Sequence, residues 1–117
     1  MFDIDVEHRP DHPVVARVFG SIDLLTARAL RLCVDDHAGA DGLVLDFSRV
    51  DFLAAAGLAV LTDTDQRASR DSLAWALVAN TRPVLRPLEV LRLVDRLPVH
   101  DTVPDAVAAV RAAMVVS

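Results

Sequence analysis

The chain has 117 residues, of which 53% are hydrophobic and 25% are charged, a composition that predicts one folded domain over residues 1–117 rather than a disordered segment. Its net charge of −5 argues against a duplex nucleic-acid binder, which needs a basic face to displace counterions. No apolar run reaches the roughly 18 residues of a membrane span, and the acidic N-terminus is unlike a secretory signal, so the sequence predicts a cytoplasmic protein without membrane insertion.

The first predicted elements form a hairpin. Apolar and polar residues alternate over Phe2–Glu7, which is typical of a half-buried strand. Turn-forming residues follow at Arg9–Pro13, and Val14–Phe19 is again strand-like. Because only a few residues separate the two segments, we expect them to pair as an antiparallel hairpin.

The next predicted element is a helix over about Leu25–His37, which Gly39 and Gly42 terminate. Its expected apolar stripe contains Leu24, Leu25, Ala29, Leu32 and Cys33. Since Cys33 lies on that stripe and is the only cysteine, a buried and inert thiol is predicted, with no internal disulfide.

A short apolar run, Leu43–Phe47, predicts a central strand that is covered on both faces. Asp46, Ser48 and Arg49 are expected at its carboxyl end, the edge where open parallel sheets usually carry their sites. A second helix is then predicted, with its buried N-terminal half in Ala54–Leu61 and its end near residues 69–71.

The remaining chain predicts a buried strand at Leu73–Val78 and a turn at Pro83–Arg86. A third helix is expected over Pro87–Val94, because proline is tolerated at a helix start and costly inside. A short edge strand and a final helix complete the prediction, at Leu97–His100 and at about Pro104–Val115. Alternating strands and helices indicate parallel βαβ units, and the opening hairpin makes the sheet mixed.

Three segments taken in order resemble one known family: Gly20–Ala27, Leu43–Leu61, and the stretch from Pro83–Val90 through the terminal helix. They are similar to the STAS domain family, which includes bacterial anti-sigma-factor antagonists. The resemblance implies an α/β fold with a mixed central sheet of four to five strands, an N-terminal β-hairpin and about four helices packed mainly on one side.

The family signature carries Asp-Ser-Ser ahead of a glycine, and its first serine is the residue that an anti-sigma kinase phosphorylates. Here those places hold Ala54, Ala55 and Ala56, followed by Gly57. Alanine has no hydroxyl, so Ala55 is expected to be a degenerate phosphosite, and the domain to bind constitutively or to be switched in another way. Alternatively, the three alanines are simply good helix formers packed against the sheet.

The resemblance also implies a partner surface beside this turn. Asp23 belongs to it or caps the first helix, and both roles are compatible. The residues expected to bind a partner are Asp23, Leu24, Ser48, Arg49, Ala54, Ala55, Ala56, Gly57 and Leu58.

The function implied by the resemblance is a non-catalytic, anti-sigma-factor antagonist-like domain that docks on an ATP-binding anti-sigma factor of the kinase type. The sequence offers no catalytic constellation, no metal-ligand spacing and no phosphate loop, so neither an enzyme nor a cofactor is predicted. Two alternatives remain: a STAS accessory subunit of a lipid-transport ATPase, which the terminal helix disfavours, or a sensor that binds a nucleotide or apolar molecule near Asp23 and Ser48. A monomer or weak homodimer is expected.

Overall fold

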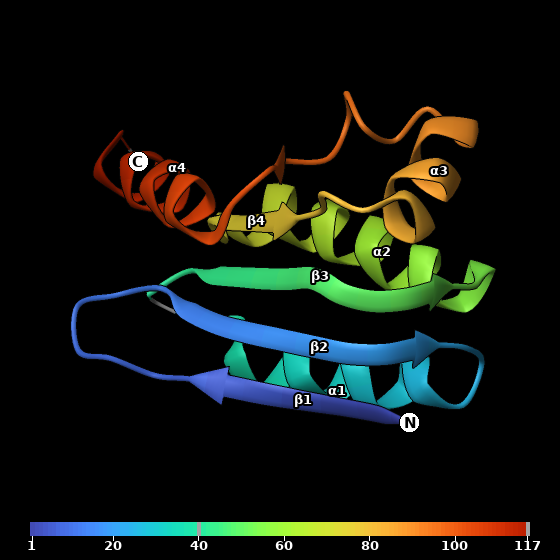
Figure 1. Cartoon of the computed structure of the whole chain (residues 1–117). Coiled ribbons are helices and arrows are strands. Elements are labelled where there is room, and N and C mark those ends of the chain that lie inside the picture. Colours follow the sequence, from blue (N-terminus) through green and yellow to red (C-terminus); the bar gives the residue numbers. More distant parts are fainter. Residues whose placement is uncertain (40, 117) are drawn as a thin grey trace.

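Residues 1–39 and 41–116, which the computed structural model describes, form a five-stranded sheet in the order β1-β2-β3-β4-β5. The strands are β1 (Phe2–Glu7), β2 (Val14–Ile22), β3 (Leu43–Leu53), β4 (Trp75–Val78) and β5 (Val99–His100). β1 and β2 pair antiparallel, whereas β2, β3 and β4 run parallel, as Figure 1 shows. β5 pairs parallel with β4. The same residues form four helices: α1 (Thr26–His37), α2 (Ala55–Asp71), α3 (Arg82–Val90) and α4 (Val103–Val116).

Hydrophobic packing covers both faces of the central strand β3. Leu43, Leu45 and Phe47 belong to one cluster, which also receives side chains from α1, α2 and α3. Val44 points to the opposite face, because successive strand residues alternate, and it joins a smaller cluster with Val110 of α4. The predicted mixed sheet with helices mainly on one side is therefore confirmed.

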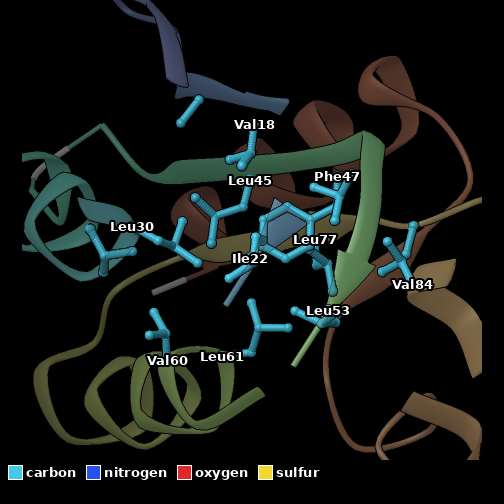
Figure 2. Close-up of a cluster of buried hydrophobic side chains, with 14 of the residues drawn as sticks. Val18, Ile22, Leu30, Leu45, Phe47, Leu53, Val60, Leu61, Leu77 and Val84 are labelled. Atoms are coloured by element: carbon cyan, nitrogen blue, oxygen red, sulfur yellow. The ribbon is translucent and has the colours of Figure 1, made fainter. Parts of the chain in front are cut away.

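The larger cluster is built from side chains that meet between the sheet and the helices (Figure 2). Phe47 and Ile22 are fully buried there, together with Leu30 of α1 and Leu61 of α2. This aliphatic core fixes the ends of β2 and β3 against the beginning of α2.

The predicted antiparallel hairpin is confirmed, and its register places Phe2 opposite Gly20 and Glu7 opposite Val15. The prediction that β3 ends at Phe47 was wrong, because the strand continues to Leu53. Two register shifts against β2 insert extra β3 residues in this stretch, and such bulges interrupt the alternation that a sequence pattern relies on.

The prediction of a turn at Pro83–Arg86 and a helix from Pro87 was also wrong. α3 begins at Arg82 and contains Pro87 in its interior. Val84 and Leu88 lie one turn apart and are both fully buried, so their packing outweighs the hydrogen bond that Pro87 cannot donate.

The predicted apolar stripe of α1 was only partly right. Cys33 is buried as expected, whereas the four other stripe residues are exposed. The buried face of α1 instead consists of Ala27, Leu30, Cys33 and Val34. The helix begins at Thr26, so Leu24 and Leu25 precede it and face outward.

Candidate functional site

The carboxyl ends of β2 and β3 meet at one edge of the sheet. Ile22 is opposite Leu53 in the parallel register, and the Ala54 N–H donates to the Ile22 carbonyl at 2.9 Å. The chain leaves β2 toward α1 and leaves β3 toward α2 at this edge (Figure 1). Consequently, the two segments predicted from the resemblance, around Asp23 and around Ala55, are held side by side.

Asp23 organises the turn between β2 and α1. One carboxylate oxygen accepts hydrogen bonds from the backbone N–H groups of Leu25 and Thr26, each at 2.9 Å. The Thr26 hydroxyl accepts from the Asp23 N–H and donates to the Ser21 carbonyl, both at 2.8 Å. The capping role expected of Asp23 is therefore present, and the side chain remains exposed at the edge.

These bonds give a testable pH dependence. Donation from Thr26 to the carboxylate is the main cause that lowers the pKa of Asp23. Since folding lowers this pKa, the stabilisation is complete above the ordinary aspartate value of about 3.9 and is lost as the pH falls through the folded value. We expect Asp23→Ala to reduce the melting temperature by a few degrees at pH 7, with the difference from wild type shrinking toward pH 3 in thermal unfolding. A difference independent of pH would contradict the account.

The N-terminus of α2 lacks a side-chain cap. Ala54 occupies the N-cap position with φ −85° and ψ 170°, and its methyl group cannot accept a hydrogen bond. Its carbonyl oxygen accepts from the N–H groups of Gly57 and Leu58 at 3.0 and 3.1 Å. Ala55 is the first helical residue and is exposed, and no acidic residue is present in the first turn. No acidic side chain in the first turn of α2 therefore compensates the positive end of the helix dipole.

The missing cap predicts a stabilising substitution. Ala54→Asp is expected to increase the free energy of unfolding by about 1 kcal/mol, because the extended backbone at this position suits a capping carboxylate. Urea unfolding measures the change. Ala59→Ser, at an exposed interior position of the same helix, serves as the control and is expected to be slightly destabilising. An unchanged free energy of unfolding for Ala54→Asp would mean that other groups already pair with the backbone N–H groups at the N-terminus of α2.

Gly57 and Leu58, although predicted to bind a partner, are buried. A Cβ atom on Gly57 would lie 2.6 Å from Ile22 Cγ2 and 2.6 Å from Leu53 Cδ1. The missing side chain thus lets α2 lie directly on the ends of β2 and β3. Both residues position Ala55 and do not themselves form exposed surface, while Ala56 is half-buried.

Large apolar side chains are exposed on the segments of this edge. Leu24 is 75% exposed and Leu25 is 78% exposed in the turn after β2, and Phe52 is 53% exposed near the end of β3. We call Asp23, Leu24, Leu25, Phe52, Ala54 and Ala55 the edge surface. Phe52 is opposite Ser21 in the sheet register, so all three large apolar residues lie near the same end of the sheet. Exposed apolar patches are typical of protein-binding surfaces. Phe52 was not predicted as a site residue. Leu25 was predicted in the apolar stripe of α1, because a hydrophobic pattern alone does not show where a helix begins.

Ser48 and Arg49 lie inside β3 rather than after it. The Asp46 carboxylate accepts hydrogen bonds from the Ser48 N–H at 3.0 Å and from the Ser48 hydroxyl. Asp46 is buried, so these bonds satisfy a carboxylate that would otherwise be costly to bury. Ser48 is five residues from Leu53, about 17 Å along a strand, which separates this pair from the edge surface.

Side chains of the metal-ligating types and the single thiol both lie among the described residues. No group of three or more histidine, cysteine, aspartate or glutamate side chains is arranged to hold a metal ion within the described part of the chain. Burial raises the pKa of the Cys33 thiol, which disfavours the reactive thiolate. Among the described helices, none has the length and apolarity required to cross a bilayer.

Sequence comparison with known proteins identifies one family. The sequence model of the STAS domain matches residues 3–106. An anti-sigma-F factor antagonist, RsfB of Mycobacterium tuberculosis, is 32% identical over 105 residues, which cover 86% of this chain and 85% of the relative.

Two solved structures share the fold. The crystal structure of an anti-sigma factor antagonist from Mycobacterium paratuberculosis aligns with a TM-score of 0.84 and 30% identity, covering 95% of each chain. A protein of Thermotoga maritima, described as a putative anti-sigma factor antagonist, aligns with a TM-score of 0.77 and 21% identity, covering 92% of this chain and 94% of that one.

Proposed function

Because the chain belongs to the STAS domain family, we propose that it is a non-catalytic regulatory domain of the anti-sigma-factor antagonist type. It docks through the edge surface on an ATP-binding anti-sigma factor and thereby controls how much sigma factor is free. The observation that carries the proposal is the position of Ala55, which is exposed at the start of α2, at the end of the sheet where Leu24 after β2 and Phe52 in β3 are also exposed.

The position of Ala55 has a direct consequence for regulation. A phosphoryl group there would add about 1.5 to 2 negative charges and three acceptor oxygens, enough to remodel a docking surface. Ala55 offers no hydroxyl to receive it, so phosphorylation at this residue is chemically excluded. We therefore propose a surface that is held permanently in its small, uncharged form.

The proposed complex forms between one copy of this chain, a cytoplasmic monomer or weak homodimer, and the anti-sigma factor. Exposed leucine and phenylalanine side chains supply apolar area, and Asp23 supplies a charge at the rim of the interface. Neither a metal ion nor a cofactor is required for this role.

A titration by calorimetry against the ATP-binding anti-sigma factors of the host tests the proposal. We expect Leu24→Asp to raise the dissociation constant by about tenfold or more, since a charge replaces a contacting apolar side chain. Leu32→Asp is the matched control, because Leu32 is 63% exposed on α1 but lies outside the edge surface. Equal effects of the two variants would contradict docking at this edge, and binding only to a lipid-transport ATPase would favour the accessory-subunit alternative.

A further inference from the structure

Helix α4 presents two neighbouring stripes of side chains, of which the first is buried in the hydrophobic core. Ala106 and Val110 are fully buried against β3 and β4. A second stripe consists of Pro104, Val107, Ala108 and Arg111, spaced as neighbours on one helix face, and Val107 also packs against the core cluster. This second stripe forms one wall of a groove with a volume of about 410 Å³.

The opposite wall of the groove belongs to the N-terminal hairpin. It is lined by Val15 and Arg17 of β2 and by Glu7, Arg9 and His12 around the turn. The groove remains open because α4 packs mainly on β3, β4 and β5. In the strand order these strands lie away from β1, which forms the opposite edge of the sheet. Its volume falls in the range of about 300–1,000 Å³ typical of small-molecule sites.

The rim of the groove is positively charged in a protein whose net charge is −5. It carries three arginines and one glutamate. Glu7 pairs with Arg17 at 2.8 Å and with Arg9 at 2.6 Å, so one carboxylate is shared by two guanidinium groups. Arg111 makes no ion pair within the described residues. An anionic head group would therefore find an unpaired guanidinium beside apolar walls.

We propose that this groove binds a small amphipathic organic anion of the medium-chain carboxylate class. The apolar tail lies between Val15 and Val107, and the carboxylate faces Arg111, with Arg9 and Arg17 nearby. A carboxylate matches the planar fork of a guanidinium, and the valine, proline and alanine walls match an alkyl chain. Val15 lies seven residues from Ile22, about 23 Å along β2, so this site is separate from the edge surface.

Octanoate is the probe for the test, followed by nuclear magnetic resonance of the isotope-labelled protein. We expect saturable shifts of the Val15, Val103 and Val107 methyl signals, with no comparable response to octylamine, whose chain is the same length but whose charge is opposite. Absence of saturable shifts, equal shifts with octylamine, or shifts confined to other residues would each overturn the proposal.

Three variants make the test specific to the groove. Ala108→Glu places a carboxylate inside the groove at an exposed helix position and is expected to weaken octanoate binding by about tenfold or more. Ala113→Glu makes the same change at an exposed position outside the groove lining, on the far side of the helix from Pro104, and is expected to leave binding nearly unchanged. Arg111→Gln should lower the affinity by about fivefold. Equal affinities for Ala108→Glu and Ala113→Glu would refute binding at this site.

Discussion

Ala55→Asp is expected to raise the dissociation constant for the anti-sigma factor by at least about 100-fold while leaving the fold intact. The carboxylate would lie on the proposed interface, where burial against an apolar partner removes its hydration without a compensating charge. At the same time, an acidic residue in the first turn of α2 interacts favourably with the helix dipole, so the free energy of unfolding should not fall. Calorimetric titration and urea unfolding measure the two quantities separately.

Gln66→Asp provides the control for this variant. Gln66 is exposed on the same helix, about three turns beyond Ala55, so the substitution adds the same charge away from the edge surface. Its dissociation constant should match that of the wild-type protein. If Ala55→Asp also binds as tightly as wild type, Ala55 lies outside the interface and the proposed role of this residue is wrong.

Gly57→Val is expected to reduce the free energy of unfolding by about 3 kcal/mol. A Cβ atom at this position overlaps with Ile22 and Leu53, which are themselves buried and have little room to move. Removing this steric overlap requires α2 to shift away from the ends of β2 and β3. That shift would also displace Ala55, so we expect weaker docking on the anti-sigma factor in addition to lower stability.

The matched control is Ala59→Val, two residues further along α2 at an exposed position. It introduces the same side chain and should cost only about 0.5 kcal/mol of helix propensity. Gly57→Ala tests whether the free energy of unfolding rises or falls. Helix propensity alone would raise it by about 1 kcal/mol, whereas the overlap with Ile22 and Leu53 predicts that it falls. Gly57→Val and Ala59→Val proteins of equal stability would show that close packing at Gly57 is not required.

Much of the fold could be predicted because the pattern and the packing agree. The alternation in Phe2–Glu7 gives a half-buried strand, and the continuous apolar run at Leu43–Phe47 gives a strand that is covered on both faces. In both segments, neighbouring helices and strands cover the apolar side chains.

The errors occurred where tertiary packing outweighed a local rule. Pro87 is accommodated inside α3 because Val84 and Leu88 are buried on the same face. The bulges beyond Phe47 hide the second half of β3 from a period-two pattern. Neither effect can be recognised without knowing which segments are neighbours in space.

The candidate site was only partly accessible from sequence. The resemblance led to Asp23 and Ala55, which the structure brings to one edge. Exposure of Leu25 and Phe52 required the structure, because an apolar residue in a sequence is ordinarily assigned to the core. Ser48 was placed at the edge by the expectation that β3 ends early, and the longer strand separates it from that edge.

The most direct test of the account follows binding and phosphoryl transfer together, using each ATP-binding anti-sigma factor of the host with radiolabelled ATP. The account predicts tight binding of the wild-type chain without incorporated phosphate, and phosphorylation of Ala55→Ser at residue 55, located by mass spectrometry. Transfer of phosphate to the wild-type chain, or no binding to any of these factors, would contradict the claim that this domain is an antagonist locked in its unphosphorylated form.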